Sequence, residues 1–407
     1  MKKSLHLVFL LFVAVLVGAC NKPDDTPKPL NLTPEALQLV QSSNAFGLDL
    51  FAGVLDEAEP GKNVMISPLS VSLALSMTYN GAAGDTRTAF EQTLRTPDLS
   101  RDQINRYNQE LVTALLAHDP KVILEIANSI WYRNEYQILP DFIERNQTYY
   151  SAEVNAADFN NPATLGLING WVDEKTHSKI EKIIDQINPE SFMFLINAIY
   201  FKGAWEYEFD KKETSNREFY LEDGSTVTVP MMNQEIDLNM FTHERFVSAE
   251  LPYGKGNWSM LVFLPLENYT VEDVVGLMNE DTWSAWMKSY LPATEVNLYL
   301  PRFQFAFDQN LNNVLTSMGL GVAFTDGADF SDIAPGLPLA ISKVLHKTFI
   351  DVNEEGTEAA AVTSVEIGLT STGNYFMVNK PFLFAITERS TGAILFIGKV
   401  LNPNLKE

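Results

Sequence analysis

The sequence predicts a large α+β domain built on a wide β-sheet, and three segments support this. Residues 122–132 alternate like a strand of a large sheet, and residues 192–205 form a long, almost wholly apolar run, typical of a strand buried on both faces. Residues 68–77 are apolar nearly all round, which predicts an interior helix. Residues 357–370 also alternate with period two, although their flanks are typical of a loop. This last segment therefore has the pattern of a strand and the position of a loop.

One face of the period-two segment is free of charge. It begins with Thr357, Ala359 and Ala361, whereas the opposite face carries Glu358 and Glu366. As an extended strand, the segment would span about 45 Å. Its small first residues would let that end slide between neighbouring strands with little steric conflict. The alternative is an ordinary exposed loop that alternates by chance.

The N-terminus predicts export and lipid attachment. Two lysines precede an apolar run over residues 7–17, which is too short to span a membrane and ends in small residues before Cys20. Residues 1–19 are therefore a predicted signal peptide, and the end of this run resembles a bacterial lipobox in which Cys20 is lipidated. Residues 20–35 are a predicted flexible tether. With Cys20 as the sole cysteine, no intramolecular disulfide can form.

The charge balance restricts the partners. The formal net charge is −23, and removal of residues 1–19 takes away two lysines and no acids, which leaves −25. Such a surface disfavours nucleic acids and heparin-like polyanions. A length of 407 residues would suggest two or three domains, but no change of composition marks a boundary after the tether. We therefore expect a single domain over residues 36–407.

The residues that carry enzyme chemistry do not form a recognisable pattern. No Gly-x-Ser-x-Gly elbow is present, and the His243-Glu244 pair lacks a second histidine at metal-binding spacing. The sequence also contains no phosphate loop and no dinucleotide fingerprint. We therefore expect no catalysis, no cofactor and no metal.

Several segments, in order along the chain, resemble the serpins, a family of protease inhibitors. The resemblance covers roughly residues 36–405 and is carried by residues 63–86, 168–180, 192–205, 229–232, 251–254, 260–265, 296–307, 376–384 and 395–403. It implies a large central sheet that can accept a reactive loop as an extra strand. It further implies two more sheets, about eight or nine helices, and a reactive-centre loop at about residues 354–375.

The resemblance also implies roles for individual residues. The hinge of the loop would comprise Glu354, Gly356, Thr357, Glu358, Ala359, Ala360 and Ala361. The breach, where insertion begins, would contain Trp205 and Arg302. The shutter, which holds the sheet closed, would contain Ser67, Ser70, Asn197 and His346. We expect an ion pair between Glu354 and Arg302. The alternatives are two separately solvated charges, serines that only cap a helix, an ordinary core tryptophan, and an isolated buried histidine.

Two family spacings, counted from Gly356 and from Pro381, place the scissile bond between Thr370 and Ser371. Leu369, one position earlier, is the alternative. A threonine suits elastase-like or subtilisin-like serine proteases, and Leu369 would suit chymotrypsin-like or papain-type enzymes. Trypsin-like targets are disfavoured, because no Lys or Arg lies between Lys347 and Lys380.

The expected function is inhibition of serine proteases, with cysteine proteases as a further possibility. The strand from Thr357 stays unpaired until cleavage and then inserts, carrying the covalently bound protease with it. The partners would be target proteases. The lipid on Cys20 would attach the chain to the bacterial outer membrane, on its periplasmic or outer face. We expect the chain to be a monomer. The alternatives are a serpin-fold lipoprotein that is only a carrier or a substrate, and an unrelated lipoprotein module.

Overall fold

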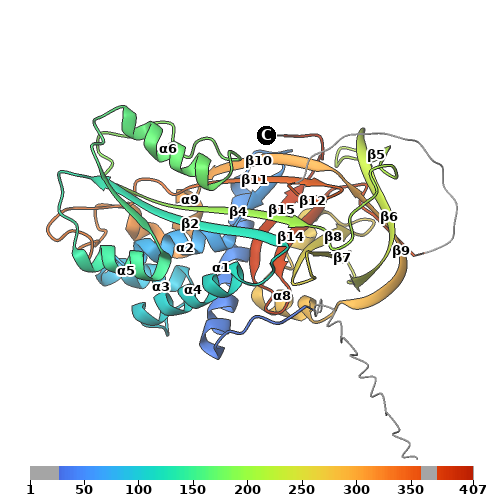
Figure 1. Ribbon diagram of the computed structural model, residues 1–407, viewed down its shortest axis with the longest axis horizontal. Coiled ribbons are helices and arrows are strands. Elements are labelled where there is room, and N and C mark those ends of the chain that lie inside the picture. Colours follow the sequence, from blue (N-terminus) through green and yellow to red (C-terminus); the bar gives the residue numbers. More distant parts are fainter. Residues whose placement is uncertain (1–26, 359–373, 407) are drawn as a thin grey trace, which may run out of the picture.

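Two β-sheets organise the protein, shown in Figure 1 as a computed structural model that describes residues 27–358 and 374–406. The first sheet has six strands, in the order β10 (Phe303–Asn310), β11 (Leu345–Asn353), β12 (Gly356–Thr357), β4 (Met193–Ala204), β2 (Val122–Arg133) and β3 (Glu153–Ala157). Both segments predicted as long sheet strands are present, as β2 and β4, and they pair antiparallel along their length.

The second sheet runs in the order β1 (Val64–Ile66), β15 (Ile394–Val400), β14 (Phe382–Glu388), β8 (Trp258–Pro265), β7 (Phe246–Tyr253), β6 (Thr226–Thr242), β9 (Leu291–Pro301) and β13 (Tyr375–Met377), with β5 (Ser215–Tyr220) beside β6. Two separate further sheets were expected here. They are joined because the long strand β6 pairs with β7 toward its end and with β9 along most of its length.

Nine α-helices lie within the described residues: α1 (Pro34–Glu57), α2 (Pro68–Tyr79), α3 (Gly84–Thr93), α4 (Arg101–Leu116), α5 (Pro140–Tyr150), α6 (Ala163–Lys175), α7 (Val271–Val275), α8 (Glu280–Met287) and α9 (Asn312–Leu315). Every residue of α2 except Ala74 is buried, which confirms the predicted interior helix. It contacts β4 of the first sheet and β15 of the second.

The first sheet is covered differently on its two faces. Helices α2 to α5 lie on one side and α6 lies on the other (Figure 1). Helix α6 is attached by its own apolar cluster, in which Ile168, Trp171 and Val172 pack against Trp131 of β2 and Ile196 of β4. On the outer face, the sheet is therefore covered by α6 and the segment that follows it.

Strand β4 is less buried than its apolar sequence predicts. Most of its residues between Met193 and Tyr200 are only partly buried, so the expectation of burial on both faces is wrong for this part. The physical reason is that β4 pairs with β2 along one edge, whereas within residues 27–358 and 374–406 its other edge pairs only with the two residues of β12. Among the described residues, large apolar side chains of β4 therefore line an edge that has no paired strand beyond β12.

The domain begins earlier than residue 36. Thr33 caps α1, and the backbone amides of Lys28 and Leu30 donate to the side chains of Asn257 and Ser390. Residues 28–35, expected to belong to the flexible tether, are thus part of the folded unit because their backbone groups find partners on it.

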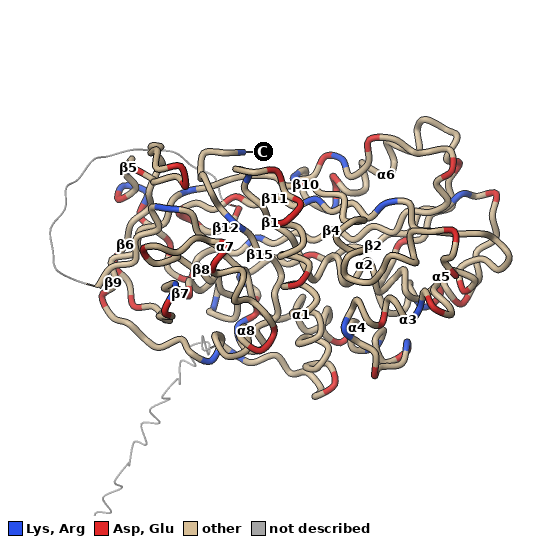
Figure 2. Tube along the Cα trace, turned by 180° about the vertical axis from the view of Figure 1, so that it is seen from behind, with Lys and Arg blue, Asp and Glu red and all other residues tan. Residues whose placement is uncertain are grey.

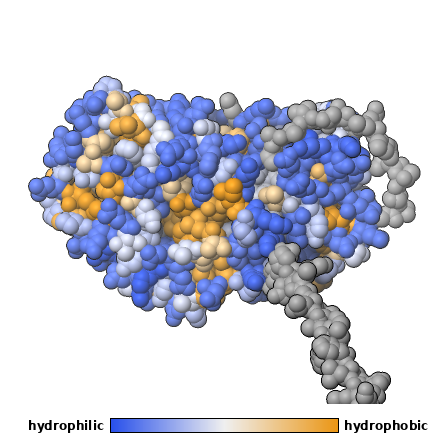
Figure 3. Space-filling view, in the orientation of Figure 1, coloured by the Kyte–Doolittle hydropathy of each residue, from blue (hydrophilic) through white to orange (hydrophobic). Residues whose placement is uncertain are grey.

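Charged and apolar residues are both distributed over the surface. Lys and Arg positions are scattered among the more numerous acidic ones (Figure 2). Apolar side chains reach the surface in separate patches, one of them over the middle of the face shown in Figure 3. Among the described residues, no helix has the length and apolar content needed to cross a bilayer.

Candidate functional site: the insertion point of the first sheet

Two residues of the predicted hinge form a strand inside the first sheet. Gly356 and Thr357 of β12 pair with Ala204 and Gly203 of β4 on one side and with β11 on the other. The expectation that the strand stays wholly unpaired is therefore wrong at Thr357. The sheet opens at this end just enough to admit two small residues.

Gly356 is required by the close approach of β4. Its φ is +151°, and a Cβ atom at this position would lie 2.1 Å from the carbonyl oxygen of Gly203. No real Cβ contact is this short, so a side chain here would displace β12 from its place beside β4. The glycine predicted for the hinge thus has a steric reason.

Thr357 points into the core. Its hydroxyl lies 2.6 Å from that of Tyr253, whose ring stacks on Trp205 with centroids 4.4 Å apart. The Trp205 indole Nε1 donates to the carbonyl of Asn353 at 2.9 Å, just before the hinge. Burial raises the pKa of Tyr253, so its hydroxyl stays protonated and able to donate. The predicted breach tryptophan therefore lies beside the inserted residues.

The ion pair expected at the hinge is present. The Arg302 Nε lies 2.7 Å from Glu354 Oε1, and both the second guanidinium nitrogen and the Thr214 hydroxyl contact the same oxygen. Glu354 is 1% exposed, so this pair is largely removed from water. Next to it, Glu355 pairs with Lys211. These contacts fix the chain immediately before β12.

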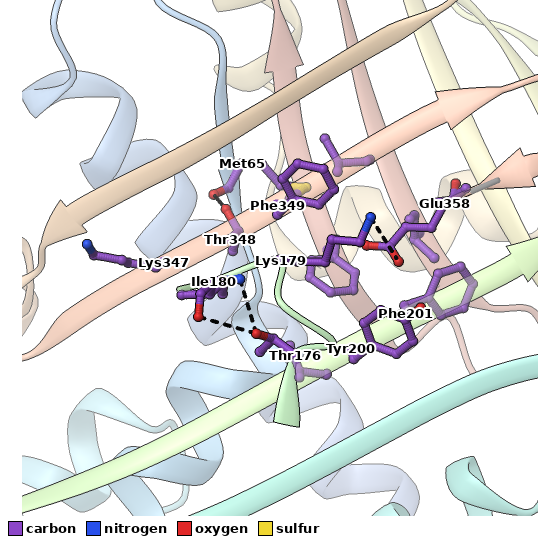
Figure 4. Close-up of a pocket in the computed structure, with 15 residues that line it drawn as sticks. Met65, Thr176, Lys179, Ile180, Tyr200, Phe201, Lys347, Thr348, Phe349 and Glu358 are labelled. Atoms are coloured by element: carbon purple, nitrogen blue, oxygen red, sulfur yellow. Dashed lines mark hydrogen bonds and ion pairs between the residues drawn. The ribbon is translucent and has the colours of Figure 1, made fainter. Parts of the chain in front are cut away.

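Beyond Thr357 the edges of β4 and β11 diverge around a cavity of about 330 Å³. Both strands form its walls, and α2 forms its floor. The end of α6 and the segment that follows it form its outer side. The lining residues include Phe194, Leu195, Ile199, Val344, Leu345, Ser70 and Ile180. A smaller cavity, drawn in Figure 4, lies directly beside Thr357 and Glu358. The space available to a further strand thus begins where β12 ends.

The four predicted shutter residues are near this cavity but form two groups. The Ser67 amide donates to His346 Nε2 at 2.9 Å, and the Ser67 hydroxyl accepts from the Ser70 amide. Asn197 instead donates to Asn128 of β2 at 2.8 Å. Burial lowers the pKa of His346 to about 4, so the ring is neutral at pH 7, as an accepting Nε2 requires.

Glu358 leaves the strand. Its φ is +70°, and its amide donates to the Asp351 carbonyl of β11. It lies on the face opposite Thr357, as the alternation predicts, where its carboxylate approaches Lys179, from the segment after α6, to 3.9 Å. Burial raises the pKa of Glu358, and interaction with the Tyr200 hydroxyl lowers it.

Sequence reasoning missed several of these partners. Tyr253, Thr214, Asn128, Tyr200 and Lys179 were not predicted as site residues, although Lys179 lies in a segment that carries the serpin resemblance. They come from distant parts of the chain, so no local spacing identifies them. The predicted residues Cys20, Ala359, Ala360, Ala361, Leu369, Thr370 and Ser371 lie outside the described residues. In the part of the chain that is described, no three His, Cys, Asp or Glu side chains gather as a metal site requires.

Comparison with known proteins agrees with this architecture. The family described as "Serpin (serine protease inhibitor)" matches residues 41–403. Bovine Serpin A3-3 is 36% identical over 90% of this chain and 89% of its own length, and an uncharacterized serpin-like protein of Methanosarcina acetivorans is 34% identical over 92% and 88%.

Solved structures agree as well. The thermophilic serpin tengpin in its native state superposes with a TM-score of 0.81 at 34% identity, covering 93% of this chain and 97% of tengpin. Human thyroxine-binding globulin, solved in complex with thyroxine, gives a TM-score of 0.83 at 31% identity, covering 92% of this chain and 100% of the globulin. Together with the strand order and the hinge described above, these matches show that the chain belongs to the serpin family.

Proposed function

We propose that this protein inhibits serine-type endopeptidases as a suicide substrate, and that its cleaved loop inserts between β4 and β11. The observation that carries the proposal is the position of Gly356 and Thr357. They already form a strand between β4 and β11, and an unfilled cavity continues below them. A chain that was only an exposed loop would have no reason to start a strand there.

The reaction begins as ordinary proteolysis. The serine hydroxyl of the protease attacks the carbonyl carbon of Thr370, and the bond to the Ser371 nitrogen breaks. The new amino group of Ser371 takes up a proton, and Thr370 remains bound to the protease as an ester. Residues 358–370 are then free at one end and can continue the strand that β12 begins.

Insertion would be strongly favourable. Each inserted residue can add backbone hydrogen bonds to β4 and β11, at about 0.5–1.5 kcal/mol net per bond. The uncharged face would cover the partly buried apolar residues of β4, with about 25 cal/mol for each Å² removed from water. The total could reach some tens of kcal/mol as an upper value, enough to distort a protease that is attached to the moving end.

The target class and location follow from the sequence. Thr370 favours elastase-like or subtilisin-like proteases, and Leu369 would extend the range to cysteine proteases of papain type. The mature chain would be held by a lipid on Cys20 at the bacterial outer membrane, as a monomer on its periplasmic or outer face. Its acidic surface disfavours nucleic acid and heparin as partners.

The test is to mix the mature chain with pancreatic elastase and analyse the products on a denaturing gel. The proposal predicts a conjugate that survives SDS and a loss of elastase activity near equimolar ratio. Clean cleavage with elastase still active would instead identify a serpin-fold substrate or carrier and overturn the proposal. Mass spectrometry of the released C-terminal peptide would locate the scissile bond, expected to be Thr370–Ser371.

A further inference from the structure

Lys179 faces the point at which the hinge leaves the sheet. Its ammonium group lies 3.9 Å from Glu358 Oε2 and 4.9 Å from the centre of the Phe349 ring on β11. Figure 4 shows these three side chains together. The Lys179 side chain is 32% exposed and that of Glu358 only 5%. A carboxylate this buried needs a cation or hydrogen-bond donors to remain stable.

The backbone around Lys179 holds it in place. It follows α6 in a turn in which the Thr176 hydroxyl donates to the Val172 carbonyl and accepts from the Ile180 amide. The Lys179 amide donates to the Thr176 carbonyl at 3.0 Å. The lysine is therefore presented from a fixed turn and not from a long flexible loop.

The environment of Glu358 supports a role for this contact. Burial raises the pKa of Glu358, whereas the Tyr200 hydroxyl and the charge of Lys179 act in the opposite direction. Asp351 of β11 also faces it and raises the pKa further, and Lys202 of β4 lowers it. Among these groups, Lys179 is the one contributed by the segment after α6, above the outer face of the sheet.

The register of β12 needs such a contact. A strand of two residues has little pairing energy to define its register, and a slip of one residue would turn Glu358 into the core and Thr357 outward. We propose that Lys179 is a positioning residue of the reactive loop: it seats the Glu358 carboxylate on the outer face and so fixes the register from which insertion proceeds. This inference rests on the proposed function, because its consequence is a faster and more accurate insertion.

The expected consequence is a change in the outcome of cleavage. Without Lys179 the hinge would unpair more often, and more cleaved molecules would release the protease before insertion. Recognition of the scissile bond is a separate step, so the association rate constant should stay unchanged. The number of inhibitor molecules consumed per protease should rise about threefold, as for loss of a partly exposed ion pair.

The experiment compares the mature chain with Lys179→Gln, Lys179→Arg, and the swap Lys179→Glu with Glu358→Lys. Lys182→Gln is the matched control, because Lys182 lies in the same segment and pairs with the exposed Asp185 instead. Two readouts are needed: hydrogen exchange of the amide at position 358, corrected for its intrinsic rate, and the molar ratio required to inhibit elastase.

Lys179→Gln should speed hydrogen exchange at position 358 about threefold and raise the molar ratio needed to inhibit elastase. Lys179→Arg and the swap should restore both values. The Lys182→Gln control should change neither value. Unchanged exchange in Lys179→Gln would overturn the inference. A loss of protection that the swap does not restore would also overturn it, because the lysine would then act through packing alone. Failure of the proposed function would look different. The unmodified chain would then form no conjugate, while exchange would still report on the contact.

Discussion

The Thr357 hydroxyl lies 2.6 Å from the Tyr253 hydroxyl, so the first residue of the period-two segment is already bound inside the core. Thr357 is 4% exposed, and the ring of Tyr253 stacks on Trp205. The loop insertion that we propose would therefore have a starting point that exists before any bond is cut. The substitutions below test the contacts at this point.

Thr357→Arg should convert the inhibitor into a substrate. An arginine on the buried face would place an unpaired charge beside Tyr253, which is costly, so insertion should stall and the protease should escape. Thr357→Val is the matched control, since it keeps the shape and loses one hydrogen bond, worth about 1 kcal/mol. A gel of elastase mixtures should show a conjugate for valine and only cleaved chain for arginine. Full trapping by the arginine variant would mean that the face is wrongly assigned.

Arg302→Met should strongly destabilise the fold. It leaves the Glu354 carboxylate, which is 1% exposed, without its cation, and breaking a buried pair in this way costs about 3–5 kcal/mol. Arg95→Met is the control, because Arg95 pairs with Asp49 at an exposed site where the loss should be below about 1 kcal/mol. The free energy of unfolding of both variants is measured in urea. An equal decrease in the two variants would contradict the structural role of the hinge pair.

Gly356→Ala should expel β12 from the sheet. The added Cβ would overlap the Gly203 carbonyl, so Thr357 should lose its pairing with β4 and its amide should exchange with solvent far faster. Gly170→Ala in α6, where a Cβ would meet no atom within 4 Å, should leave exchange at Thr357 unchanged and stabilise the helix by about 0.5–1 kcal/mol. Retained protection at Thr357 in the Gly356 variant would show that β12 tolerates a side chain.

His346 should make stability depend on pH. Its pKa is about 4 in the folded chain and 6.5 in the unfolded chain, so below pH 6.5 the unfolded state binds a proton that the folded state does not. The free energy of unfolding should therefore fall as the pH falls from 6.5 to about 4, by about 3 kcal/mol from this residue. His346→Gln keeps an acceptor for the Ser67 amide and should remove this slope, whereas His177→Gln, at a half-exposed site, should not. A slope unchanged in His346→Gln would exclude His346 as its source.

The sequence predicted the elements whose pattern is local. The alternation of β2, the apolar run of β4 and the apolar surface of α2 are each visible within one short segment, so they could be predicted without knowing which distant segments pack against them. The opposite faces of Thr357 and Glu358 followed from the same period. The pairing of Glu354 with Arg302 came from the family resemblance, since no local spacing joins residues this far apart.

The remaining features depend on how distant segments meet. The half-exposed edge of β4 could not be predicted, because an apolar run does not reveal whether a neighbouring strand is present. Asn197 was expected beside His346 but pairs with Asn128, which lies opposite it in the antiparallel register of β2 and β4. The joining of the two expected sheets likewise depends on β6 being long enough to pair with both β7 and β9, and these pairings are not visible in the sequence of β6 alone.

The most direct measurement is the structure of the chain after cleavage between Thr370 and Ser371. We predict that residues 358–370 then extend β12 as a full strand between β4 and β11, with Thr357 still against Tyr253 and the cavity of about 330 Å³ filled. A cleaved chain in which β4 and β11 still border an open cavity, with these residues outside the sheet, would contradict it.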